Sequence, residues 1–264
     1  MPLKAVRSLL ALWARIRPSR ERWVELGVVV FGVFVALWSE NAVQEWRWRR
    51  EVAELDAQAR VDMEENLTQA IERVALDPCL RARVSLLAEG LSGAAVRYDP
   101  KPQIARTRSS SGSGVPYAYL SPIRPWRTAT MERLVAAEAS KRVPRPRLIA
   151  YARALSTISS IGREQASEND ALGTLAPLAL GIDELTPEIR VSLLSSLGEV
   201  DNARANIELI SRRLIERGAD LRIAPDLAKV QQLLAEERET WGACVDVDKG
   251  VKLARRLKVA AQDG

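Results

Sequence analysis

The stretch that decides the fold is "RERWVELGVVVFGVFVALWSENAVQEWRWRR", residues 20–50. Its centre, from Leu26 to Trp38, holds no charged residue. This charge-free part is about 14 residues or roughly 20 Å as a helix, short of the ~20 residues that a bilayer normally requires. Tryptophans flank it on both sides, as indole rings do at the two membrane interfaces. These interface anchors are Trp23, Trp38, Trp46 and Trp48. We therefore predict a transmembrane helix over residues 23–46.

Two other interpretations of this stretch compete with a span. A cleaved signal peptide has a short basic start and small residues at its cleavage site, whereas about 25 residues precede this apolar run and Trp38-Ser39-Glu40-Asn41 ends it. A buried helix of a soluble protein is the second alternative, but it gives no reason for the flanking tryptophans. The span is the interpretation that we prefer.

Basic residues gather before the span and predict its orientation. Only Glu21 opposes them there, whereas the arginines after the span alternate with Glu40, Glu45 and Glu51. The positive-inside rule then places the N-terminus in the cytoplasm and exports the body of the protein. Residues 1–22 have helical apolar spacing that includes Trp13, which indicates a basic amphipathic segment lying in the headgroup plane. A solvated basic tail is the alternative.

Composition excludes several kinds of function. The chain has 264 residues and no histidine, so Ser-His-Asp and Cys-His catalytic arrangements are impossible and the commonest zinc ligand is missing. A formal net charge of +5 is too small to indicate nucleic-acid binding. No spacing of acids or serines singles out a catalytic pair. We predict no catalytic, cofactor or metal site.

The remaining chain has helical periodicity almost throughout. An apolar stripe from Val52 to Val74 continues directly from the span, and we expect its opposite face to be charged and solvated. Asp77-Pro78 should end this helix, with a shorter one over Leu80 to Leu91. A Pro-, Ser- and Gly-rich flexible loop follows at about 97–125.

Further helices are predicted after this loop. They cover 127–140, a stretch after Pro146, a stretch that Thr186-Pro187 begins, and a last helix from about Pro225 to Trp241. No stretch shows strand alternation. The predicted fold is therefore all-α: an N-terminal transmembrane helix that continues into a long juxtamembrane helix, followed by a helical bundle.

Four stretches of the sequence form a recognisable order: "ELGVVVFGVFVALWSENAVQEWRWRREVAELDAQARVDMEENL", "DPCLRARVSLLAEGL", "PWRTATMERLV" and "RPRLIAYARALSTI". Together they resemble a family of uncharacterised proteobacterial single-span membrane proteins. The resemblance implies an inner-membrane span, a periplasmic helical domain at 47–264, and packing roles for Trp126 and Tyr151. It also implies that Cys79 has a disulfide partner. With a periplasmic body, an even count of two cysteines suggests a Cys79–Cys244 bridge. Two free thiols in a cytosolic bundle are the alternative.

Two surfaces are candidates for binding. Residues 97–147 carry a local excess of basic side chains, which suits anionic lipid headgroups or an acidic partner, although solvated loops explain it as well. The arginines selected for anionic contact are Arg106, Arg108, Arg124, Arg127, Arg142, Arg145 and Arg147. Gly32 and Ala36 lie one turn apart in the span and would allow two spans to pack closely.

Two functions remain after these exclusions. The first is a membrane-anchored interaction protein, an accessory or scaffold subunit whose partners are membrane lipid and either another protein or a second copy. The second is a ligand-binding sensor that signals through a separate partner. An exposed apolar groove would favour the first, and an enclosed pocket with convergent polar groups would favour the second.

Overall fold

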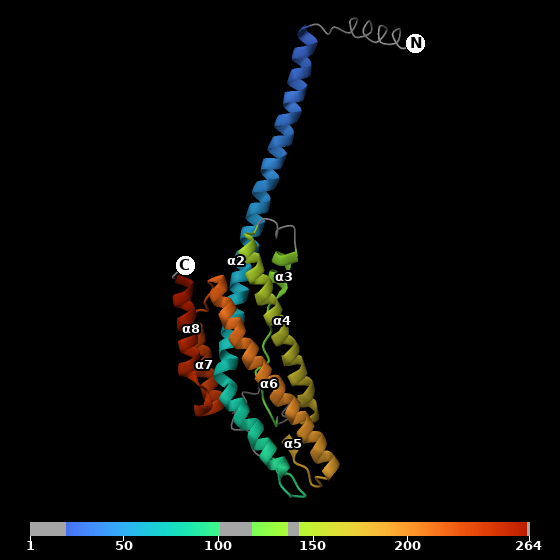
Figure 1. Ribbon diagram of the computed structural model, residues 1–264, viewed down its shortest axis with the longest axis vertical. Helices are drawn as coiled ribbons and strands as arrows, with labels where there is room; N and C mark the ends of the chain where they lie inside the picture. Colours follow the sequence, from blue (N-terminus) through green and yellow to red (C-terminus); the bar gives the residue numbers. More distant parts are fainter. Residues whose placement is uncertain (1–19, 101–117, 137–142, 263–264) are drawn as a thin grey trace, which may run out of the picture. The chain divides into compact units, whose positions relative to one another are not determined.

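The structure, a computed structural model, is all-α, as the sequence predicts (Figure 1). It describes residues 20–100, 118–136 and 143–262. Seven α-helices and one 3-10 turn lie within these described ranges. They are α2 (Arg20–Ser92), α3 (Ala129–Ala136), α4 (Arg145–Thr174), α5 (Pro177–Leu180), α6 (Pro187–Leu221), α7 (Leu227–Trp241), η2 (Gly242–Cys244) and α8 (Val247–Gln262). An isolated bridge between Tyr98 and Ile182 is the sole strand-like pairing in the same ranges.

The chain divides into two compact units, residues 1–51 and 52–264. In the first unit the described residues are helical, and their large apolar side chains are uncovered: Phe31 is 71% exposed and Phe34 is 69% exposed. Among the described residues, α2 alone is long and apolar enough to cross a membrane. Of the predicted amphipathic segment at residues 1–22, residues 1–19 lie outside the described residues.

The second unit is a helical bundle around the apolar stripe of α2. Leu55, Ala59, Met63, Leu67 and Ile71 are buried at the predicted helical spacing. Two apolar clusters follow each other along the bundle, and helices α4 and α6 contribute to both of them. Trp126 packs against the first cluster and Tyr151 is fully buried within it, as the family resemblance implied.

The prediction that Asp77-Pro78 ends the first helix was wrong, because α2 continues through Pro78 to Ser92. A proline lacks the N–H that would bind the carbonyl four residues earlier, and its ring presses on that turn. Contacts from elsewhere in the chain hold this part of the helix. The carbonyl of Ala75 accepts the backbone N–H of Asp246 at 3.0 Å, and Cys79 forms a disulfide. The helix changes direction in this region instead of stopping (Figure 1).

The disulfide joins Cys79 of α2 to Cys244, with their Cα atoms 5.1 Å apart. It closes a chain separation of 165 residues. On the chain-entropy model, closing so long a loop contributes up to about 5 kcal/mol. The suggested pairing is therefore confirmed, and the bridge ties η2, directly after α7, to the last part of α2.

The predicted last helix near Pro225 is present as α7, but it is not the last. Asp226 forms its N-cap by accepting the N–H of Ala228, and Gly242 ends it with a positive φ of 83°. A further helix, α8, follows after Cys244. This helix was not predicted from the sequence, although Gly250, Ala254 and Leu257 are buried on one side of it at helical spacing.

The described flanks of the predicted flexible loop pack into the bundle, since Tyr98, Tyr119 and Ser121 are buried. Residues 101–117 lie outside the described residues. After this segment, α3 begins at Ala129 and α6 begins at Pro187, where the Thr186 side chain accepts the N–H of Ile189 as predicted. Arg190 then donates to the carbonyls of Leu91, Gly93 and Ala95 and so caps the end of α2.

Candidate functional site

The arginines selected for anionic contact have different environments in the bundle. Arg124 binds Glu72 and Glu237, Arg127 binds Asp62 and Glu65, and Arg147 binds Asp56. An external anion would have to compete with these carboxylates. Arg145 is exposed, whereas Arg106, Arg108 and Arg142 lie outside the described residues.

The predicted membrane anchors belong to the first unit. Trp38 is 75% exposed, Trp46 is exposed, and Trp48 is partly buried. The guanidinium of Arg50 lies 5.8 Å from the centre of the Trp46 ring. Trp13 and the Trp23 side chain lie outside the described part. Gly32 and Ala36 are exposed, and a methyl group added at Gly32 would meet nothing within 4 Å.

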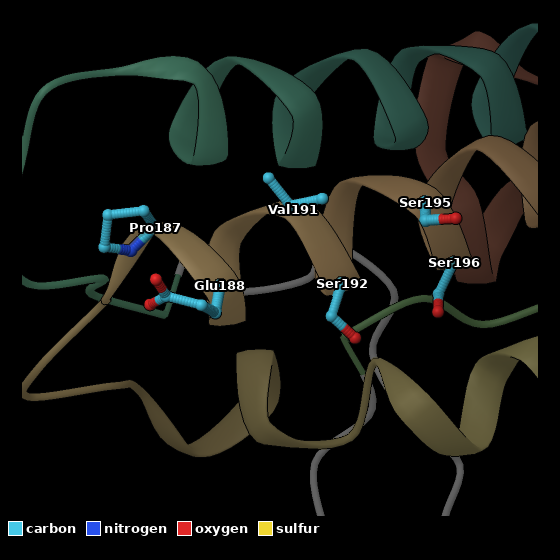
Figure 2. Close-up of a pocket in the computed structure, with 6 residues that line it drawn as sticks. All are labelled: Pro187, Glu188, Val191, Ser192, Ser195 and Ser196. Carbon is cyan, nitrogen blue, oxygen red and sulfur yellow. The ribbon is translucent and has the colours of Figure 1, made fainter.

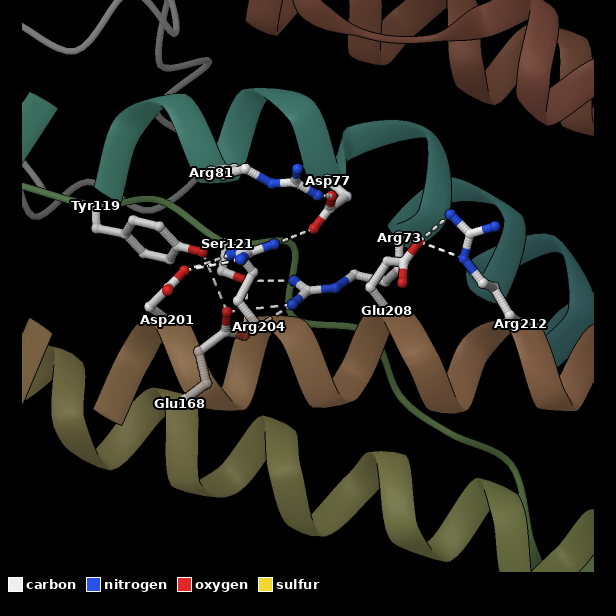
Figure 3. Close-up of polar contacts among 10 residues, drawn as sticks. All are labelled: Arg73, Asp77, Arg81, Tyr119, Ser121, Glu168, Asp201, Arg204, Glu208 and Arg212. Carbon is white, nitrogen blue, oxygen red and sulfur yellow. Dashed lines mark hydrogen bonds and ion pairs between the residues drawn. The ribbon is translucent and has the colours of Figure 1, made fainter. Parts of the chain in front are cut away.

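A layer of buried charge separates the two apolar clusters of the bundle, and the sequence did not predict it. On α4, Glu168 lies between Ile161 of one cluster and Ala171 of the other. Arg204 takes the equivalent place on α6. Arg73 and Asp77 provide the charges from α2 (Figure 3). The face of α2 opposite its apolar stripe was expected from the sequence to be solvated, and this expectation was wrong at Arg73 and Asp77, which are buried.

One half of the layer is centred on Arg73 and Glu168, whose side chains are each 2% exposed. A guanidinium nitrogen of Arg73 lies 3.1 and 3.2 Å from the two carboxylate oxygens of Glu168. Ser121 donates to the same carboxylate at 2.8 Å and also accepts from Arg73. Tyr119 donates to Glu168 at 3.2 Å. Burial, followed by the charge of Glu168, raises the pKa of Tyr119 well above its ordinary value, so the phenol stays a donor.

The other half of the layer is centred on Asp77. Arg204 binds one oxygen of Asp77 and also lies 2.8 Å from Asp201. Arg81 binds the second oxygen of Asp77 at 2.6 Å. Figure 3 shows these side chains between α2 and α6, beside the Arg73 half. Each carboxylate in the layer is thus held by a guanidinium, which leaves no carboxylate available there as a general base.

A second carboxylate cluster lies next to the disulfide. Arg124 donates to the fully buried Glu72 at 3.0 Å and lies 3.1 Å from Glu237 of α7. The indole N–H of Trp241 donates to Glu237 at 2.9 Å. Gln165 of α4 holds the Arg124 backbone through two hydrogen bonds, at 3.3 and 3.1 Å. One guanidinium therefore serves two carboxyl groups in a largely buried place.

This arrangement changes the protonation of Glu237. Burial, followed by the charge of Glu72 and a hydrogen bond with it, raises the pKa of Glu237 from 4.5 to about 7, although Arg124 and Trp241 oppose the shift. A hydrogen bond between two carboxyl groups requires that one of them carries a proton. Glu237 is therefore the group of this cluster whose pKa lies near neutral pH.

Two open grooves lie on the bundle surface. The larger, about 640 Å³, lies along the first turns of α6 and is lined by Pro187, Glu188, Val191, Ser192, Ser195 and Ser196 (Figure 2). Its side chains come from one helix, and Val191 is 67% exposed. Another groove of about 380 Å³ lies near Val61 and Thr130. Neither groove is lined by the buried carboxylates described above.

Within the described residues, no group of three or more Asp, Glu or Cys side chains is placed to hold a metal ion. No protein-family model, curated protein or solved structure matches this chain. The family resemblance drawn from the sequence therefore remains a prediction. What the structure establishes is an all-helical protein with a long N-terminal apolar helix and a disulfide-linked bundle.

The buried layer predicts a large loss of stability on substitution of Glu168 by Gln. The change would leave the Arg73 charge buried without its counter-charge, which costs roughly 3–5 kcal/mol. Glu208→Gln is the matched control, because its partner Arg212 is 47% exposed and such pairs contribute about 1 kcal/mol or less. Urea unfolding of both variants measures the difference. Equal losses would contradict the assigned importance of the Arg73–Glu168 pair.

The Glu237 cluster predicts a stability that depends on pH. Because the pKa of Glu237 is about 7 in the folded chain and 4.5 ordinarily, the folded state keeps a proton that the unfolded state releases between these values. This contribution is fully present below the ordinary pKa, decreases as pH rises, and is lost above about 7. We expect Glu237→Gln, which stays neutral, to reduce the decline of the unfolding free energy between about pH 5 and 8.

Thermal and urea unfolding across that pH range provide the measurement. Glu239→Gln is the control, because Glu239 is exposed on the same helix. It should leave the pH dependence as it is in the unchanged chain. An identical pH dependence in the Glu237→Gln variant would show that this carboxyl group does not cause it.

Proposed function

We propose that this protein is a membrane-anchored interaction protein of the bacterial inner membrane, an accessory or scaffold subunit of a membrane complex without catalytic activity of its own. In this proposal residues 23–46 span the bilayer. The N-terminus is cytoplasmic, and the bundle from residue 47 onward is periplasmic. Its partners are membrane lipid and another protein or a second copy of the chain.

The observation that carries the proposal is that one helix joins an uncovered apolar segment to a disulfide-linked bundle. Helix α2 has 73 residues and includes both the exposed Phe31 and Phe34 and the bridged Cys79. Exposed apolar surface of this extent is unfavourable in water and is covered in a bilayer. A stable disulfide is typical of an oxidising compartment outside the cytoplasm.

The charge distribution supports the orientation. The residues before the span are strongly basic, and the basic residues after it are interleaved with acids. Six basic residues precede the span, namely Lys4, Arg7, Arg15, Arg17, Arg20 and Arg22, whereas Arg47, Arg49 and Arg50 follow it closely. Under the positive-inside rule, the larger number of basic residues before the span favours a cytoplasmic N-terminus.

The interior of the bundle favours interaction over ligand binding. A sensor would need an enclosed pocket between helices with polar groups directed into it. The buried polar groups at the centre of this bundle bind one another instead, as Arg73 does with Glu168 and Arg204 does with Asp77. The described grooves are on the surface, where a partner protein has access to them.

The compartment can be tested through the thiols. Free thiols are alkylated in intact cells before lysis, and the chain is then examined without reductant. We expect Cys79 and Cys244 to be protected as a disulfide in normal cells, and to be alkylated in cells that lack periplasmic disulfide formation. A Cys79→Ser/Cys244→Ser variant gives the mobility of the open chain. Full alkylation in normal cells would contradict a periplasmic bundle.

The interaction role can be tested by native mass spectrometry. The tagged full chain is extracted from its native membranes in mild detergent, and the mass and composition of the particles are determined. We expect foreign subunits in fixed stoichiometry. A chain that emerges alone, or only with copies of itself, would contradict the accessory-subunit role in its stable form and would direct attention to a bound small molecule.

A further inference from the structure

Helix α8 carries a concentrated positive charge on one side. Five of its sixteen residues are cationic and one, Asp248, is acidic. The cations are Lys249, Lys252, Arg255, Arg256 and Lys258. The opposite side of the helix is apolar, and there Gly250, Ala254 and Leu257 are buried against the bundle. At 100° per residue, the five cations occupy the half of the helix that faces away from this buried side.

The α8 cations differ from the paired arginines of the bundle. Several exposed arginines elsewhere form an ion pair, as Arg81 does with Asp77 and Arg217 does with Asp220. In the described part of the chain, no ion pair involves the five cations of α8. Lys252, Arg255 and Arg256 are all exposed.

This arrangement is unfavourable for the helix itself. Lys252 lies three residues before Arg255 and four before Arg256, and like charges at these spacings repel each other across one turn. Folding of the bundle uses only the apolar side of α8 and gains nothing from the charged side. An anionic partner would relieve the repulsion. We infer that the outward face of α8, centred on Lys252, Arg255 and Arg256, is a docking surface for an acidic segment of a partner protein.

The apolar side of α8 favours a protein over the membrane surface as the partner. Gly250 packs beside Ile71 and Ala75 of α2, and Ala254 and Leu257 are also buried in the bundle. The apolar residues that an interfacial helix would insert into lipid are therefore used in the bundle core.

The inference rests on the interaction role proposed above and specifies the chemistry of the partner. The test uses the full chain in a neutral detergent and a fluorescent oligoglutamate peptide as the probe, with binding measured by fluorescence anisotropy. We expect the triple variant Lys252→Gln/Arg255→Gln/Arg256→Gln to bind the peptide about tenfold more weakly. Raising the salt concentration should weaken binding by the unchanged chain more than binding by the variant.

Arg153→Gln/Arg213→Gln/Lys229→Gln is the matched control. It removes the same charge from exposed positions on α4, α6 and α7 and should retain binding. Thermal unfolding shows whether each variant is folded, and the α8 variant should be at least as stable as the unchanged chain because repulsion is removed. Equal weakening in both triple variants would overturn the inference, since net charge alone would then explain binding.

A second measurement separates protein from lipid. The same chains are mixed with phosphatidylcholine vesicles that contain or lack phosphatidylglycerol. Binding that depends on α8 and on anionic lipid, without binding to the peptide, would overturn the protein partner in favour of a membrane surface. The accessory-subunit proposal is tested separately by native mass spectrometry. The subunits found there do not depend on the peptide titration, so the failure of one proposal can be distinguished from the failure of the other.

Discussion

Two turns of α2, residues 72–79, hold the bundle together, because their polar groups bind distant parts of the chain. Glu72 binds Arg124, Arg73 binds Glu168 of α4, and Asp77 binds Arg204 of α6. In the same two turns, the carbonyl of Ala75 accepts the N–H of Asp246, and Cys79 forms the disulfide with Cys244. Removing charges from water is costly, so each buried group here depends on its partner being in place.

The value of this layer lies in specificity more than in net stability. A buried ion pair often contributes little compared with apolar side chains of the same size, but a charge left without its partner costs roughly 3–5 kcal/mol. Sliding α4 along α2 by one turn would break the Arg73–Glu168 pair, and sliding α6 would break the Asp77–Arg204 pair. Apolar burial is non-directional and selects one register less strictly. We therefore interpret the layer as fixing the register of the three longest helices.

The sequence predicted those features that depend on neighbouring residues. The apolar stripe of α2, the Thr186 N-cap and the helical class follow from local spacing, and each is present. The buried charges could not be predicted in this way. Arg73 and Glu168 are separated by 95 residues and Asp77 and Arg204 by 127, so in sequence each one resembles an ordinary solvated charge. The effect of Pro78 was predicted wrongly for the same reason. The backbone N–H that binds the carbonyl of Ala75, in the turn before Pro78, belongs to the distant Asp246.

Helix α8 shows how a single small residue determines which charges face outward. Gly250 lies so close to Leu234 that a side chain would collide with it, and an added Cβ would lie 3.4 Å from Ala75. Only this face of α8 can approach α2 and α7, which fixes the rotation of the helix about its axis. Arg256 and Lys252 are then directed away from the bundle. The disulfide at Cys244 and the hydrogen bond from Asp246 to Ala75 hold the start of α8 in place. The cationic face is thus presented by a rigid support, so a partner that binds it would not have to order a mobile helix first.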